Sequence, residues 1–199
     1  SGNVDGRAFV VTDLITGSSL AQILDRLSIT ERPPSPARWA RELAEALAVA
    51  HRAGTVHRDM KPSNVMVDGD GVLVLIDFGL ARLEGATALT AENEVLGTLA
   101  YMAPEVFDGA PATPATDVYG WGLVVYELIM GRRPYADFDI VHAAHLRREG
   151  VRPLAAPPEL AALGGLVDRC LAPDPARRPV SGHALVEWFV AEDRERAPA

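Results

Sequence analysis

Residues 57–64 read His57-Arg58-Asp59-Met60-Lys61-Pro62-Ser63-Asn64, and a second short stretch, Asp77-Phe78-Gly79, follows soon after. Lys61 is the only lysine among 199 residues, whereas eighteen arginines are present. An ammonium group is a compact point charge that suits one phosphate oxygen, while a guanidinium group is a broad planar fork. The carboxylates and the amide around this lysine complete the groups that phosphoryl transfer requires: a base, a phosphate-binding cation and oxygen ligands for Mg²⁺.

The two stretches resemble the catalytic loop and the metal-binding loop of eukaryotic-like serine/threonine protein kinases. The resemblance continues in family order through Ala103-Pro104-Glu105, Asp117 and Arg178-Pro179, so it covers nearly the whole chain. Any one of these residues also fits a solvated surface turn, but the joint pattern rarely arises by chance. The resemblance implies the fold of the large (C-terminal) kinase lobe, which is mainly α with a small β-hairpin sheet.

The resemblance also implies a role for each motif residue. Asp59 is the expected catalytic carboxylate, which accepts the proton of the substrate hydroxyl, and Lys61 steadies the transferred γ-phosphate of ATP. Asn64 and Asp77 are the expected ligands of Mg²⁺. Glu105 and Arg178 are expected to form a buried ion pair. Residues with structural roles are expected to be His57, Phe78, Gly79, Glu105, Asp117 and Arg178, with Asp117 holding the backbone around His57 and Arg58.

A nucleotide site is expected near the start of the chain, where residues 10–17 resemble the hinge of a kinase. The backbone groups of Asp13 and Ile15 would meet the adenine edge. Met66 would lie under the adenine ring, although it also fits an ordinary core. The two residues expected beneath Met66 are Val124 and Leu128.

Two further motifs concern the substrate and regulation. Residues 97–101 resemble the substrate-docking loop of the serine/threonine branch, where Thr98 would bond towards Asp59; a hydroxyl at this position also fits the cap of a turn. Arg58 resembles the arginine of kinases that are activated when a phosphate in the activation segment pairs with it. The expected phosphate acceptors are Thr87 and Thr90, which otherwise are ordinary loop threonines.

Composition narrows the class of protein. A formal charge of −8 argues against a nucleic-acid or anionic membrane surface, because phosphate groups would be repelled. The single Cys170 excludes an internal disulfide and fits a reducing, cytoplasmic compartment. Residues 118–130 form an apolar run that Glu127 interrupts, which predicts a buried helix. We therefore expect one domain, with ATP and a protein substrate as partners and no nucleic acid or membrane contact from this segment.

Apolar periodicity and breaker residues predict the secondary structure. A strand is expected over 8–14 and ended by Gly17, and two more over 65–67 and 72–76 joined by a tight turn. Ser19 should cap a helix through Leu27, and Ser35 should cap a longer one that ends at Gly54. Further helices are expected over 117–130, 138–149, 159–171 and 181–191. These elements divide the chain into a hinge strand and linker (1–18), the large lobe (19–191) and a fraying, charged tail (192–199).

One departure from the family concerns the lysine that anchors the nucleotide phosphates upstream of the hinge. No second lysine exists in this chain, and its first residues already resemble the hinge. The N-terminal lobe is therefore expected to be missing and the piece alone to be inactive. Two alternatives stay open. A pseudokinase or scaffold is disfavoured by the intact Asp59, Lys61, Asn64 and Asp77, and a small-molecule phosphotransferase is disfavoured by Ala103-Pro104-Glu105 and Thr98.

Overall fold

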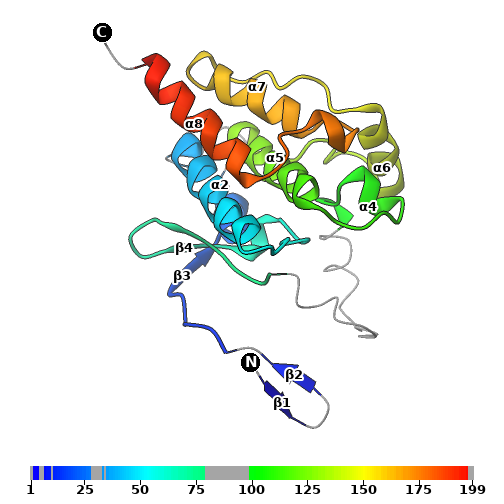
Figure 1. Cartoon of the computed structure of the whole chain (residues 1–199). Helices are drawn as coiled ribbons and strands as arrows, with labels where there is room; N and C mark the ends of the chain where they lie inside the picture. The colour runs from blue at the N-terminus through cyan, green and yellow to red at the C-terminus, as the bar shows by residue number, and fades with distance from the viewer. Residues whose placement is uncertain are drawn as a thin grey trace.

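Helices make up most of the molecule, which the computed structural model describes for residues 2–4, 7–9, 11–27, 33, 35–78 and 99–196 (Figure 1). The strands are β1 (Gly2–Val4), β2 (Arg7–Phe9), β3 (Gly17–Ser19), β4 (Val65–Asp68) and β5 (Leu73–Leu75). The α-helices are α1 (Leu20–Arg26), α2 (Pro36–Arg52), α4 (Pro104–Phe107), α5 (Pro114–Met130), α6 (Ile140–Glu149), α7 (Ala161–Cys170) and α8 (Gly182–Arg196). Single 3₁₀ turns lie at η1 (Pro62–Asn64), η3 (Pro158–Leu160) and η4 (Pro175–Arg177).

The core lies around α5, which is apolar on nearly all sides and therefore has to be surrounded by other elements. The α2 helix packs along α8 and against α5, and α7 packs against α5 from another side (Figure 1). Trp121 of α5 is fully buried, and its Nε1–H donates to the Ala40 carbonyl of α2 at 3.0 Å. This bond satisfies the polar atom of the indole inside the core. The predicted mainly α body is thus confirmed.

The helix starts follow local sequence. Ser19 and Gln22 form a reciprocal capping box at α1, with backbone-to-side-chain distances of 3.0 and 3.2 Å. Pro36 is the first residue of α2, as predicted, because its fixed φ suits that position and the N–H it lacks would have no partner there. Ser35 precedes it, but the Ser35 side chain makes no capping bond.

The sheet that matters for the site has the order β3-β4-β5 and is antiparallel throughout. The β4–β5 hairpin confirms the predicted pair of strands. Its turn is closed by the Asp68 carboxylate, which accepts hydrogen bonds from the N–H groups of Asp70 and Val72, both at 2.9 Å. In β4, Met66 lies between Ser19 of β3 and Val74 of β5.

The predicted strand over 8–14 is wrong for residues 11–14. The structure has β2 end at Phe9, and residues 11–16 lie outside any strand. Val11 and Leu14 are 78% and 90% exposed, so their apolar character is not used to pack against a neighbouring strand. Gly17 begins β3 and does not end a strand. Glycine is required there by the close approach of β4, because a Cβ at this position would lie 2.0 Å from the Val67 carbonyl oxygen.

The charged segment after Glu192 is helical as far as Arg196, which corrects the predicted helix end and tail. Arg196 pairs with Glu192 one turn earlier at 2.8 Å, and Arg41 of α2 pairs with Asp193 at 2.7 Å. Such exposed pairs are individually weak but favour continuing the helix. Across the described residues, no helix has the length and apolar character needed to cross a membrane.

Candidate active site

The loop 57–64 is held by one buried carboxylate, that of Asp117 in α5. Asp117 is 1% exposed and accepts the His57 N–H on Oδ2 at 2.7 Å and the Arg58 N–H on Oδ1 at 2.8 Å. Arg58 has φ of +71°, a left-handed conformation that is strained for an L-residue with a side chain. The two hydrogen bonds from the loop backbone stabilise this turn against that strain.

A third donor to Asp117 was not anticipated from the sequence. His51, near the end of α2, donates from Nε2 to Asp117 Oδ2 at 2.9 Å, and its Nδ1 accepts the Gly182 N–H at 3.0 Å. Because Nδ1 is an acceptor, the network assigns the neutral Nε2–H tautomer. His51 therefore connects α2, α5 and α8 beneath the loop. A histidine in a last helical turn commonly serves the helix dipole, so its position alone carried no such signal.

His57 connects the loop to the strand that precedes Phe78. Its Nε2 donates to the Ile76 carbonyl at 2.9 Å, its Nδ1 accepts the Asp59 N–H at 3.3 Å, and its ring centroid lies 4.9 Å from that of Phe78. These contacts fix the ring in the Nε2–H tautomer. They bring the two sequence stretches, 57–64 and 77–78, to one place.

Asp59, Lys61 and Asn64 form a compact polar cluster at the end of the loop. Lys61 Nζ lies 2.8 Å from Asp59 Oδ2, and Asn64 Nδ2 donates to the same oxygen at 2.9 Å and to the Asp59 carbonyl at 2.8 Å. The Asp59 side chain is 32% exposed, whereas Asn64 is buried. A cation and an amide thus orient a carboxylate that solvent can still reach.

The floor of this cluster is set by a close approach of α5 to the loop. A Cβ on Gly120 would lie 2.6 Å from the Met60 Cβ, so only glycine allows α5 to lie this near. Met60 is buried and follows Asp59 directly. The backbone at the carboxylate therefore rests on a rigid, buried helix.

Asp77 is brought beside Asn64 by the β4–β5 hairpin. The Ile76 N–H donates to the Asn64 carbonyl at 2.9 Å, and Asp77 is the next residue along the chain. Asp77 is exposed and has φ of +58°. The backbone turns sharply there, at the point where the described part of this segment ends with Phe78.

The other predicted site residues are placed less closely together. Asp13 is exposed and Ile15 is half-buried in the irregular segment 11–16. Met66 is half-buried in β4, and the buried residues Val124 and Leu128 lie in α5. Four predicted residues fall outside the described part of the chain: Gly79, Thr87, Thr90 and Thr98.

Glu105 and Arg178 form the ion pair that the sequence predicted. Two parallel bonds of 2.8 Å join the guanidinium to the carboxylate, and the Arg178 side chain is fully buried. Burial by itself would raise the pKa of Glu105, but the hydrogen bond from Arg178, a backbone hydrogen bond and the charge of Arg178, with a smaller effect from Thr116, outweigh it and hold that pKa below its usual value. The pair ties α4 to the segment before α8.

Tyr101 and Glu127 make a second contact that the sequence did not reveal. The Tyr101 hydroxyl donates a short hydrogen bond to Glu127 Oε2, and the Arg133 guanidinium lies 5.7 Å from the centre of the Tyr101 ring. Burial raises the pKa of the Glu127 carboxyl, and the Tyr101 bond only partly opposes this. The one signal in the sequence was a lone acidic residue in the apolar run 118–130, which was interpreted only as an interruption.

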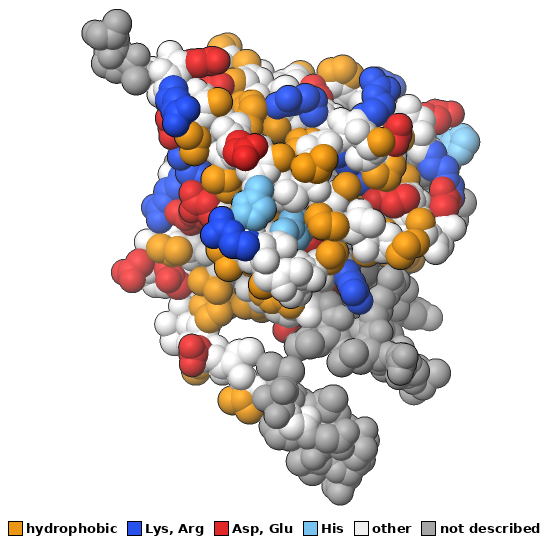
Figure 2. All heavy atoms as spheres, viewed as in Figure 1, with side chains coloured by type: hydrophobic (Ala, Val, Ile, Leu, Met, Phe, Trp, Pro, Cys, Tyr) orange, Lys and Arg blue, Asp and Glu red, His pale blue; other side chains and the backbone are white. Residues whose placement is uncertain are grey.

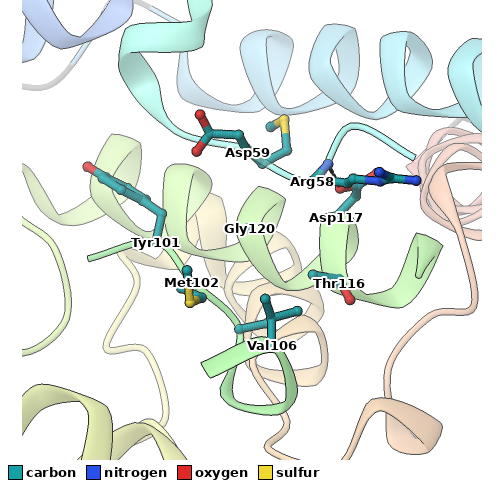
Figure 3. A pocket seen from close by; sticks show the side chains of 10 residues that line it. Arg58, Asp59, Tyr101, Met102, Val106, Thr116, Asp117 and Gly120 are labelled. Carbon is teal, nitrogen blue, oxygen red and sulfur yellow. Dashed lines mark hydrogen bonds between the residues drawn. The ribbon is translucent and has the colours of Figure 1, made fainter. Parts of the chain in front are cut away.

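A hollow lies between the loop, the segment after Tyr101 and the α5 helix. Figure 3 shows Asp59 and Tyr101 toward one end of it and Arg58 and Asp117 toward the other. On the face seen in Figure 2, acidic and basic side chains are interspersed, so the described residues there present no continuous basic stripe. Within the described residues, no group of three or more His, Cys, Asp or Glu side chains has the geometry of a metal site.

Known proteins with similar sequences are kinases. The family model described as "Protein kinase domain" matches residues 3–190. The serine/threonine-protein kinase PkaA of Streptomyces coelicolor is 40% identical over 176 residues, which are 85% of this chain and 32% of that protein. Two relatives from Mycobacterium tuberculosis are the serine/threonine-protein kinases PknL, 37% identical over 90% of this chain and 45% of PknL, and PknE, 36% identical over 90% of this chain and 32% of PknE.

The chain thus spans between about a third and a half of the length of these relatives. The family match runs from within β1 to within α8, and it includes the loop that holds Asp59 and the pair formed by Glu105 and Arg178. The chain belongs to the protein kinase domain family, and its relatives are eukaryotic-like serine/threonine kinases of bacteria.

Proposed function

We propose that this chain carries the catalytic loop of a protein serine/threonine kinase, which transfers the γ-phosphate of ATP to a protein hydroxyl. The observation that supports this most is the position of Asp59. Its carboxylate is oriented by Lys61 and Asn64 at 2.8 and 2.9 Å, remains in reach of solvent, and sits on a loop pinned by Asp117. A positioned carboxylate of this kind can accept a hydroxyl proton as the oxygen attacks phosphorus.

Lys61 would serve a second purpose once nucleotide is bound. Its ammonium group lies against Asp59 in the described structure, so it can neutralise negative charge that builds up next to the attacking oxygen. A point charge on a flexible stem can shift towards a phosphate oxygen without breaking a fixed two-pronged geometry. Lys61 therefore fits the role of holding the transferred phosphate.

Asn64 and Asp77 would hold Mg²⁺. The fit rests on donor chemistry: both amide hydrogen bonds of Asn64 go to Asp59, which turns its amide oxygen away from that carboxylate, and Asp77 follows the residue that is bonded to Asn64. A carboxylate and an amide oxygen suit a hard cation that keeps several waters. Mg²⁺, when bound there, would neutralise phosphate charge.

We further propose that residues 19–191 belong to the large lobe, with 1–18 as the hinge segment and linker that lead into it. Asp13 and Ile15 would offer backbone groups to adenine, and Met66, which continues the sheet from Ser19, would lie under the ring. The N-terminal lobe would supply a second cation for the phosphates, because Lys61 is the only lysine here. Thr98 would bond towards Asp59 in the substrate-docking loop.

Arg58 supports a proposal about regulation. Its backbone is fixed by Asp117, while its side chain is exposed beside the catalytic residue. A phosphate on Thr87 or Thr90 could pair with this guanidinium and so activate the enzyme.

The test of the proposed function is the Asp59→Asn variant of the complete natural protein. Asn is nearly the same size but cannot accept the proton, so transfer to Ser or Thr should fall by about 10²- to 10⁴-fold while the melting temperature is kept. Phosphoamino-acid analysis of the products is the second measurement. Full activity in the variant, or products that hold only phosphotyrosine, would overturn the proposal, and binding of MgATP without transfer in the wild type would favour a pseudokinase.

A further inference from the structure

Arg147 of α6 is a buried cation whose bonds to described residues all go to main-chain carbonyl oxygens. It is 4% exposed, and its Nη1 lies 3.0 Å from the Leu99 and Met102 carbonyls and 3.4 Å from that of Ala100. Its Nε donates to the Ala143 carbonyl one turn earlier in α6, at 3.1 Å. Burial lowers the pKa of Arg147, yet a guanidinium in a protein keeps its charge. A full positive charge is thus buried against the carbonyl oxygens of one short turn, residues 99–102.

That turn is held poorly by its own backbone. The hydrogen bond that closes it, from the Met102 N–H to the Leu99 carbonyl, is long at 3.4 Å. Arg147 Nη1 reaches the carbonyls at both ends of the turn with distances of 3.0 Å. Bonds to an ionised donor are about twice as strong as neutral ones. The guanidinium therefore stabilises the shape of the turn more than the turn's own backbone hydrogen bond does.

The turn carries Tyr101 into the hollow beside the catalytic loop. Tyr101 and Asp59 both line this hollow (Figure 3). Tyr101 is also anchored on α5 through its hydrogen bond to Glu127. Just downstream, the chain is anchored a second time where Glu105 meets Arg178. Arg147 is a third anchor, which holds the carbonyl groups of the turn itself at Leu99 and Met102.

We propose that Arg147 is a positioning residue for the protein substrate: by clamping the turn at 99–102 it sets the polypeptide-docking surface beside Asp59. This inference rests on the proposed kinase function. Arg147 has no bond to the catalytic loop, to Asp77 or to the adenine-side residues among those described for it. Its loss should therefore weaken the use of a polypeptide and leave the use of ATP unchanged.

The test compares Arg147→Met with Arg148→Met in the complete natural protein. Arg148 is the adjacent arginine of α6, but it is exposed and pairs with Asp108. The probes are MgATP and a serine/threonine peptide that the wild type phosphorylates. For R147M we expect the KM for peptide to rise about tenfold, as for the loss of roughly one charge-assisted bond. The KM for ATP and the peptide-independent hydrolysis of ATP should stay within about twofold of the wild type.

The inference is overturned if R147M keeps the peptide KM of R148M, or if peptide transfer and ATP hydrolysis fall in parallel. If R147M does not fold, Arg147→Lys decides: it keeps the charge but cannot bridge both carbonyls, so a raised peptide KM with an unchanged ATP KM supports the inference and an unchanged peptide KM overturns it. The proposed function fails separately, through a wild type that phosphorylates no Ser or Thr.

Discussion

Replacing Arg178 by Met would separate the buried ion pair between α4 and the segment before α8. Of its side-chain partners, Glu105 would keep the Thr116 hydroxyl, which donates to its Oε1 at 3.0 Å. The carbonyls that Arg178 now serves would also lose a charged donor; they belong to Ala172, Ala115 and Pro173 and lie at 2.7, 3.1 and 2.9 Å. The Met side chain would keep most of the apolar volume, so the loss is mainly electrostatic.

The expected cost follows from burial. The Arg178 side chain is 0% and the Glu105 side chain 14% exposed, so solvent cannot replace the missing partner. Removing one half of a buried pair costs about 3–5 kcal/mol, because the other charge is left uncompensated. The double variant Glu105→Gln with Arg178→Met should lose less than the sum of the single losses, by a coupling of about 0.5–3 kcal/mol.

The direction in which stability changes with pH provides a second test. The pKa of Glu105 is lowered in the folded wild type, so its contribution is present above the unfolded value of about 4.3 and is lost as pH falls through the folded value. Without Arg178, burial should raise the pKa of Glu105 above the unfolded value. The contribution of Glu105 to stability then has the opposite pH dependence. It is present below the unfolded pKa and is lost as pH rises through the raised folded pKa.

Urea unfolding followed by tryptophan fluorescence measures these changes. Trp121 and Trp39 are 0% and 5% exposed, so their emission reports loss of the core. Arg177→Met is the matched control, since that neighbouring arginine is exposed. The reasoning is refuted if R178M loses less than about 1 kcal/mol, the lower limit for an unpaired buried charge, or if its stability falls between pH 5 and 3 as steeply as that of the wild type.

Three further predictions concern the loop 57–64, the proposed catalytic loop, and its surroundings. Asp117→Ala leaves the N–H groups of His57 and Arg58 without their carboxylate, so the free energy of unfolding should fall by about 2–6 kcal/mol, at about 1–3 kcal/mol for each unpaired group, and peptide transfer should be lost. Urea titration and a radiolabel assay check both, and normal transfer would contradict the role of Asp117. Tyr101→Phe removes the bond that lowers the pKa of Glu127, so that pKa should rise further; carboxyl NMR titration measures it, and an unchanged value would contradict this. The double variant of Thr87→Ala and Thr90→Ala should lose activation in the complete protein, and mass spectrometry that finds neither threonine phosphorylated in the active enzyme would argue against it.

The sequence predicted the helical body because its signals are local. Pro36 at a helix start, the capping box of Ser19 and Gln22, and the apolar run of α5 each act within a few residues, so spacing along the chain is enough to find them. The order of the motifs around Asp59 was equally readable. The family resemblance that it implied agrees with the match over residues 3–190.

Tertiary structure decided what depends on contacts between distant residues. The apolar residues from 8 to 14 had the composition of a strand, but a strand needs a partner, and in the folded chain Val11 and Leu14 face solvent. The close approach of β4 decided the role of Gly17.

The same reason explains which site residues the sequence missed. His51 contacts Asp117, which is 66 residues away in the sequence, and Arg147 contacts Leu99, which is 48 residues away. Neither residue has a local pattern that distinguishes it from other charged or polar helix residues. The sequence alone determined which groups the loop 57–64 offers and which helices support it. Only the fold decided which buried polar groups hold that loop in place, because hydrogen-bond partners of buried atoms are chosen by packing in three dimensions.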